Sequence, residues 1–202
     1  MMSSAKPFWL DPNSLWLVQE RFGGAEVLSS REEVLRFACA QAPSDGLYLE
    51  LGVASGDSLR FLAAAFPRKQ FLGFDSFEGL PEAWVRGDNR VWKGAFRQEH
   101  LPSVPPNAQL VPGWFRDTLP PFSKKPVAFL HVDCDLYSST REALEMLDIG
   151  PGAVIAFDEF YNYPGFEEHE FKAFGEFLLK KRFKAKAIAY NAVHEQAAFL
   201  LS

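Results

Sequence analysis

Cysteine is scarce in this chain, which contains two cysteines in 202 residues. Cys39 and Cys134 lie far apart, so they match neither a paired zinc-site spacing nor the disulfide framework of small secreted domains. The sequence also lacks a basic start followed by an apolar run, and it has no stretch of about 20 apolar residues that would span a bilayer. These absences predict a soluble, cytoplasmic protein without a membrane partner.

An excess of positive charge is missing as well. The chain has 26 acidic and 21 basic residues, which gives a formal net charge of −5 at pH 7. Proteins that bind nucleic acid usually carry a basic face. The basic cluster within residues 180–186 is typical of a solvated helix end, where the helix dipole favours cations. A nucleic-acid partner is therefore not expected.

The apolar content bounds the number of domains. With 48% hydrophobic residues, the chain can bury one sizeable core and is too short for two, so we expect a single domain over residues 1–202. Short apolar runs predict strands at Leu47–Leu51, Gln70–Phe74, Ala108–Val111, Val127–Val132 and Gly152–Phe157. Amphipathic runs predict helices at Ser30–Ala40, Asp57–Phe66, Ser139–Leu147 and Glu167–Arg182. The Ser30/Glu33 and Ser139/Glu142 patterns predict capping boxes.

The end of the chain departs from this alternation. Lys184–Tyr190 and Ala197–Leu201 are joined by too few residues for a crossover helix, since parallel strands need about a dozen or more linking residues. They must form an antiparallel hairpin. An α/β fold with a doubly wound, mostly parallel sheet and an antiparallel C-terminal strand is typical of the Rossmann-like class I methyltransferases.

Two segments have weaker periodicity. Residues 1–45 are predicted to form a helical N-terminal cover, in which Pro7–Gly24 is either a flap or a short helix at the domain edge. Residues 79–107 are rich in Pro, Gly, Trp and Arg, and a connection of this length is uncommon unless it moves or binds something. We predict a lid over the active site, with a surface excursion carrying one helix near Ala95–His100 as the alternative.

A strand, a glycine turn and a helix start follow one another in Leu47–Ser58. Glycines let backbone amides approach a ligand, and the helix N-terminus points free N–H groups into the same crevice. The G-x-x-x-G spacing of Gly52 and Gly56 differs from the dinucleotide G-x-G-x-x-G, and no Lys follows as in a phosphate-binding loop. The turn therefore indicates a cofactor that ends in an amino acid rather than a phosphate.

A nucleoside is indicated by the next strand. Asp75 ends that strand about twenty residues after the glycine turn, where a carboxylate can accept hydrogen bonds from ribose hydroxyls. Trp114 follows the third strand and is a candidate to stack on adenine, with core packing as the alternative.

Four carboxylates follow the next two strands: Asp133, Asp135, Asp158 and Glu159. Neighbouring strand ends lie about 5 Å apart, so these side chains are expected to converge beside the cofactor crevice. Such like charges need a cation, and oxygen ligands favour a hard divalent ion, Mg²⁺ or else Ca²⁺ or Mn²⁺. The alternative is that they only cap the following helices. His131 shares the strand face of Asp133 but is expected to be a buried strand histidine.

These motifs resemble those of the macrocin and mycinamicin (TylF-like) sugar O-methyltransferases and the related novobiocin-pathway enzyme. The resemblance covers Gly46–Phe174 and is carried by Glu50–Val53, Gly73–Pro81, Asp133–Thr140 and Phe157–Glu159. It implies a class I methyltransferase fold, S-adenosylmethionine as the methyl donor, and a divalent metal in the acceptor site.

Carried over by position, the resemblance makes Asp133, Asp158 and Glu159 the metal ligands and Asp135 the general base. Glu159 stands where the macrolide enzymes have a second Asp, and the region before the fold, which in the family helps form the acceptor pocket, is short here. The candidate cofactor-binding residues are Glu50, Gly52, Val53, Gly56, Ser58, Asp75, Ser76, Trp114 and Asp133.

The sequence thus predicts an O-methyltransferase that uses S-adenosylmethionine to methylate a hydroxyl of a small glycosylated or polyhydroxylated metabolite, with metal assistance. The acceptor hydroxyl would coordinate the ion and lose its proton to Asp135. Two alternatives stay open: a metal-dependent hydrolase that activates water with the same carboxylates, and a non-catalytic module that binds S-adenosylmethionine. Assembly into a homo-oligomer is also left open.

Overall fold

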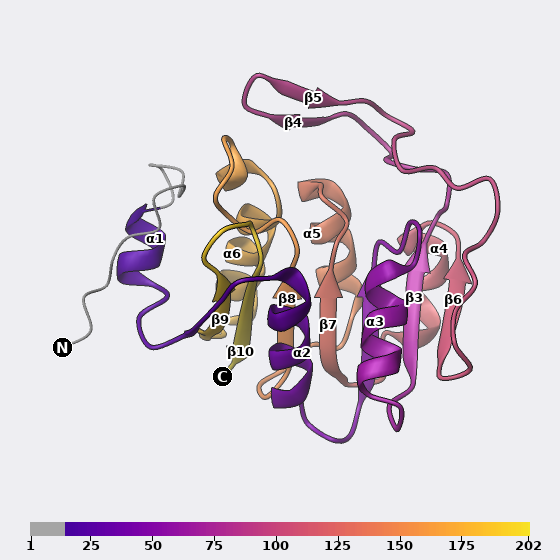
Figure 1. The fold of residues 1–202 in the computed structure, drawn as a ribbon, viewed down its shortest axis with the longest axis horizontal. Helices are drawn as coiled ribbons and strands as arrows, with labels where there is room; N and C mark the ends of the chain where they lie inside the picture. The colour runs from indigo at the N-terminus through magenta and orange to yellow at the C-terminus, as the bar shows by residue number, and fades with distance from the viewer. Residues whose placement is uncertain (1–14) are drawn as a thin grey trace.

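The computed structural model describes residues 15–202, which are built around an eight-stranded sheet (Figure 1). Its strand order is β1-β9-β10-β8-β7-β2-β3-β6. Five of these strands were predicted from apolar runs, and the structure places them at β2 (Leu47–Leu51), β3 (Phe71–Asp75), β6 (Ala108–Pro112), β7 (Val127–Val132) and β8 (Val154–Phe157). Every residue of β7 and β8 is buried, as expected for central strands covered on both faces.

The strand directions agree with the predicted sheet. β2, β3, β6, β7 and β8 pair in parallel. β10 (Ala197–Leu201) runs antiparallel between β8 and β9 (Ala185–Asn191), so the predicted C-terminal hairpin is confirmed. The strand order changes direction between β2 and β7, because β3 and β6 lie on one side of this pair and β8 on the other. In sheets of this kind, ligands bind beyond the carboxyl ends of the strands at such a point.

Helices cover both faces of the sheet (Figure 1). α2 (Arg31–Gln41) and α3 (Asp57–Ala65) pack on one face, and α5 (Tyr137–Met146) and α6 (Glu170–Lys181) pack against each other on the opposite face. Leu59, Leu62 and Ala63 of α3 are at most 1% exposed, which is the i, i+3, i+4 spacing of a core-facing stripe. Burying each such leucine contributes about 1.5–3 kcal/mol. The shorter elements are α4 (Phe115–Thr118), η2 (Pro120–Phe122) and η3 (Phe166–Glu168).

One of the two predicted capping boxes forms only in part, and the other is wrong. Ser30 caps α2, since its Oγ accepts a hydrogen bond from the Glu33 N–H at 3.1 Å, but the Glu33 carboxylate reaches back to Ser29. α5 begins at Tyr137, and its N-cap makes no side-chain hydrogen bond. Ser139 therefore lies inside the helix rather than at its cap. α6 likewise begins at Glu170 instead of Glu167, because η3 occupies residues 166–168.

The N-terminal part contains an element that the sequence did not indicate. α1 (Leu15–Glu20) and α2 are separated by a three-residue strand, β1 (Glu26–Leu28), which pairs in parallel with β9. The earlier part of the predicted Pro7–Gly24 flap lies outside the described residues. No helix within residues 15–202 combines the length and apolar character that a membrane crossing requires.

The long segment 79–107, which joins β3 to β6, contains a β-hairpin. The helix near Ala95–His100, given as the alternative to a lid, does not form. β4 (Trp84–Arg86) and β5 (Asn89–Val91) form this antiparallel hairpin, whereas residues 95–100 adopt turns and bends. The hairpin lies beyond the carboxyl ends of the central strands (Figure 1). It is anchored to the start of α6, because the His169 Nε2–H donates a hydrogen bond to the Val85 carbonyl at 2.7 Å.

Candidate active site

A cavity of about 550 Å³ opens at the carboxyl ends of the central strands. This volume falls within the range of small-molecule sites, about 300–1,000 Å³. Its lining includes most of the candidate residues, namely Gly52, Val53, Asp75, Ser76, Trp114, Asp133, Asp135, Asp158 and Glu159. The glycine turn and the acidic residues, predicted from separate motifs, thus share one cavity.

The glycine turn after β2 is forced by a close backbone approach. Gly52 has φ +85°, and a Cβ there would lie 1.8 Å from the carbonyl oxygen of Asp133. The Gly52 N–H is held by the Phe74 carbonyl at 2.9 Å. A side chain at this position would therefore push the end of β2 away from the residue that follows β7.

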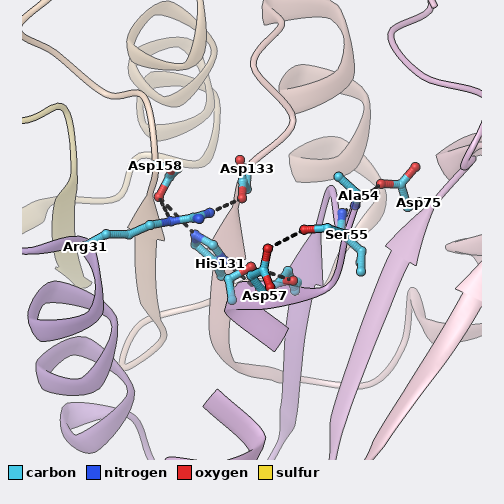
Figure 2. A network of polar contacts seen from close by, with 11 residues as sticks. Arg31, Ala54, Ser55, Asp57, Asp75, His131, Asp133 and Asp158 are labelled. Carbon is cyan, nitrogen blue, oxygen red and sulfur yellow. Dashed lines mark hydrogen bonds and ion pairs between the residues drawn. The ribbon is translucent and has the colours of Figure 1, made fainter. Parts of the chain in front are cut away.

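Asp75 holds the glycine turn in place. Its Oδ2 accepts hydrogen bonds from the backbone N–H groups of Val53 and Ala54, each at 2.8 Å (Figure 2). Its Oδ1 accepts a third from the Phe77 N–H at 2.7 Å. Because each carboxylate oxygen has two lone pairs, Oδ1 keeps one acceptor position for a ribose hydroxyl.

Three candidate cofactor residues do not line the cavity: Glu50, Gly56 and Ser58. Glu50 is fully buried, accepts a hydrogen bond from the Ser58 hydroxyl at 3.1 Å, and lies 2.9 Å from Nδ1 of His131. Gly56 is the backbone N-cap of α3. Glu50 and Ser58 thus belong to a buried polar layer beneath the cavity.

His131 is the buried strand histidine that the sequence indicated, with no exposed surface. Burial disfavours its charged form, but the carboxylates of Asp158 and Glu50 outweigh this effect and raise its pKa to about 10. The imidazolium therefore donates from Nδ1 to Glu50, and its Nε2 lies 3.7 Å from Oδ1 of Asp158.

The acidic residues converge around Asp133. One carboxylate oxygen each from Asp133, Asp135 and Glu159 lie within 4.8 Å of one another, and Asp133 and Asp158 form a second such group with His131. Burial, followed by the charge of Asp158, raises the pKa of both Asp133 and Glu159 well above the usual range, and it raises that of Asp135 to about 7. Without a further cation beside them, these carboxyl groups therefore hold their protons more tightly than free carboxyl groups do.

Sequence reasoning missed Arg31, the first residue of α2. Its Nε lies 2.5 Å from Oδ1 of Asp158, and its Nη2 pairs with Oδ2 of Asp133 (Figure 2). These two carboxylates, with burial opposing them, raise the pKa of Arg31 above its ordinary value. The sequence did carry one signal of this role. An arginine in the first turn of a helix is disfavoured by the helix dipole, so its presence there indicates an acidic partner from elsewhere in the fold.

Two further groups near the cluster were not predicted. Arg86 of the hairpin lies over the rings of Trp84 at 4.6 Å and Tyr163 at 4.4 Å, and it pairs with Glu195. These contacts hold the positive charge of Arg86 at the wall of the cavity, which Arg86 lines. Glu170 is fully buried behind the cluster, and its carboxylate has no side-chain hydrogen-bond partner within residues 15–202.

The acidic residues fit a hard divalent cation. Oε2 of Glu159 is buried and has no hydrogen-bond partner in the described part of the chain, which leaves an uncompensated acceptor beside Asp133 and Asp135. Carboxylate oxygens are the ligands that Mg²⁺, Ca²⁺ and Mn²⁺ prefer. Arg31 and His131 compensate Asp158 and part of Asp133, but they do not reach this oxygen of Glu159.

Most of the chain matches the sequence model of one protein family. Residues 24–181 match the model described as macrocin O-methyltransferase (TylF). A curated relative from Streptomyces olivaceus, 8-demethyl-8-(2,3-dimethoxy-α-L-rhamnosyl)-tetracenomycin-C 4′-O-methyltransferase, is 31% identical over 159 residues. The match covers 64% of this chain and 60% of that relative, so the chain spans less than two thirds of the relative's length.

Solved structures of methyltransferases share the fold. The calicheamicin methyltransferase CalS11 matches with a TM-score of 0.62 and 23% identity, over 84% of this chain and 76% of that one. The O-methyltransferase NovP matches with a TM-score of 0.60 and 22% identity, over 84% and 78%. The predicted class I methyltransferase fold is therefore confirmed.

Proposed function

The chain belongs to the macrocin O-methyltransferase family, and on this premise we propose that it transfers a methyl group from S-adenosylmethionine to a hydroxyl of a sugar-bearing or polyhydroxylated small molecule. The observation that carries the proposal is the shared cavity, in which the glycine turn and the acidic cluster face one space. The acceptor class is supported by the sugar O-methyltransferase activity of the Streptomyces olivaceus relative and by that of CalS11, a TDP-rhamnose 3′-O-methyltransferase.

The donor side of the proposed site is the glycine turn and the ends of β3 and β6. The N–H groups of Gly52 and Val53 already donate within the fold, so the backbone carbonyls of these two residues would receive the ammonium group of the cofactor's amino-acid end. Asp75 would accept a hydrogen bond from its ribose, and Trp114 would stack on its adenine. In this scheme Glu50 and Ser58 support the turn from below. The methyl group would then point toward the acidic cluster.

On the acceptor side, Asp133, Asp158 and Glu159 would hold a divalent cation. When bound, the cation would act as a Lewis acid that makes an acceptor hydroxyl easier to deprotonate. Asp135 groups with Asp133 and Glu159 and lines the cavity, so its carboxylate is placed to act as a general base toward an acceptor hydroxyl there. The hydroxyl proton would pass to Asp135 while the new C–O bond forms and the C–S bond breaks.

Residues 79–107 are proposed as the lid over this reaction. Leu80, Pro81, Trp84 and Arg86 line the cavity, so the segment is positioned to exclude water from the methyl group. A cytoplasmic location and the absence of a nucleic-acid partner stay predictions from the sequence, and assembly into a homo-oligomer stays open.

Labelled S-adenosylmethionine provides the test of this function. We expect calorimetry to detect one S-adenosylmethionine site, and we expect label to appear in at least one member of a panel of rhamnosides and nucleotide-linked rhamnoses when Mg²⁺ is present. Chelation should stop transfer and restored Mg²⁺ should recover it, because the cation lowers the pKa of the hydroxyl.

Three results would contradict parts of this scheme. Failure to bind S-adenosylmethionine would favour the hydrolase alternative. Binding without transfer to any acceptor would favour the non-catalytic module. Transfer that is insensitive to chelation would remove the metal and leave Asp135 to act alone.

A further inference from the structure

The Arg31 side chain occupies the carboxylates that the proposed cation needs. Its guanidinium lies between Asp133 and Asp158, and it contacts one oxygen of each (Figure 2). Asp133 and Asp158 are two of the three residues to which the metal was assigned. A cation that binds both of them therefore meets a positive charge already in its place.

The position of Arg31 in α2 carries an electrostatic cost. A cation in the first turn of a helix is disfavoured by the helix dipole. α2 otherwise follows the favourable pattern, with Glu32 and Glu33 in the same turn. The arginine is thus stabilised at this position by its two acidic partners, and it loses this stabilisation when they take another cation.

The arginine also has room to move. Its side chain is 31% exposed and lines the cavity, so the guanidinium can withdraw toward solvent without disturbing the core. The backbone beneath it is fixed independently, because Ser30 caps the helix and Ser29 bonds to the Glu33 carboxylate at 2.9 Å. Withdrawal therefore requires side-chain rotation only.

We propose that Arg31 and the divalent cation are alternative partners of Asp133 and Asp158. Arg31 neutralises the acidic pair in the ion-free protein and keeps the cluster compact, and the cation must displace it to bind. This inference rests on the proposed function, because it takes the acidic cluster as the metal site. It makes Arg31 a positioning residue that lowers the affinity for the cation and keeps the empty site folded.

Binding of Mn²⁺ to the purified protein tests the competition, with electron paramagnetic resonance reporting free Mn²⁺. Arg31→Gln should bind Mn²⁺ about tenfold or more tightly than the wild type, since the apparent affinity of the wild type is reduced to the fraction of molecules in which Arg31 has left the carboxylates, about one in ten or fewer. Arg31→Lys separates bridging from charge, because lysine keeps the charge but loses the planar fork. It should also bind more tightly than the wild type. The matched control is Arg36→Gln. Arg36 is an exposed arginine of the same helix and stacks over Phe61, away from the acidic cluster, so this variant should bind Mn²⁺ as tightly as the wild type does.

A second measurement needs no variant. Phenylglyoxal modifies accessible guanidinium groups, and mass spectrometry of the peptide that contains Arg31 gives the rate at this residue. If Mn²⁺ displaces Arg31, this rate should rise on addition of Mn²⁺, while the rate at exposed Arg36 stays constant.

The outcomes separate this inference from the proposed function. Equal Mn²⁺ affinity in the wild type and Arg31→Gln, with an unchanged modification rate, overturns the role of Arg31 and leaves the metal site standing. No Mn²⁺ binding in either protein overturns the metal site and the inference together. Tighter binding in Arg31→Gln but not in Arg31→Lys reduces the effect to simple charge repulsion and contradicts displacement of a bridge.

Discussion

Asp135→Asn is expected to lower the rate of methyl transfer by about 10²–10⁴-fold and to leave the affinity for S-adenosylmethionine nearly unchanged. The expected loss is large because the amide cannot take up the proton of the acceptor hydroxyl. Cofactor affinity should persist because Asp135 groups with Asp133 and Glu159 and is not one of the residues proposed to contact the cofactor.

The substitution preserves the local structure. Asp135 has φ +62°, and asparagine tolerates this left-handed conformation better than most residues. The side chain has the same shape, and the position is 7% exposed, so little other change is expected. Single-turnover transfer of labelled methyl and calorimetry with S-adenosylmethionine measure the two effects separately.

Asp45→Asn, at an exposed position before β2, provides the matched control and should turn over as the wild type does. Undiminished transfer by Asp135→Asn would contradict its role as the base. Loss of cofactor binding in this variant would instead make it part of the donor site.

Gly52→Ala should destabilise the fold by about 2–5 kcal/mol, which combines the cost of a left-handed residue with that of overpacking. The added Cβ would meet the carbonyl oxygen of Asp133 at 1.8 Å, and this contact is to backbone rather than to a flexible side chain. The Asp133 N–H is itself bonded to the Leu51 carbonyl at 2.8 Å, so neither strand end is free to shift. Denaturant unfolding measures the loss, and calorimetry should detect no binding of S-adenosylmethionine.

Gly175→Ala is the control for this substitution. Gly175 lies within α6, and no atom lies within 4 Å of a Cβ added there. Alanine should therefore stabilise the helix by about 0.5–1 kcal/mol. A Gly52→Ala protein that unfolds at the wild-type denaturant concentration would show that the approach of the turn to Asp133 is not required.

Much of the sheet was predictable, because a central parallel strand must be apolar along its whole length. β7 and β8 show this as continuous buried runs. β1 was not predictable, since it has three residues, two of them exposed, and it forms only because β9 offers a free edge. The hairpin β4–β5 was missed for a similar reason, as its position depends on contacts with the start of α6.

The parts of the site that follow the ends of parallel strands were predictable from the sequence. The glycine turn and the acidic pairs each follow a strand, and parallel strands bring their carboxyl ends to one edge. Arg31 was not predictable, because its partners are 102 and 127 residues away in the sequence. Glu50 belongs to the turn motif, but its side chain faces Ser58 and His131 in the interior, and the sequence of a strand buried on both faces does not reveal this direction.

The most direct test is a crystal structure of the protein with S-adenosylhomocysteine and Mn²⁺, in which anomalous scattering locates the ion. We expect the nucleoside between Asp75 and Trp114, and one anomalous peak within coordination distance of Asp133, Asp158 and Glu159. A nucleoside bound outside this cavity, or an ion bound away from the acidic cluster, would contradict the account.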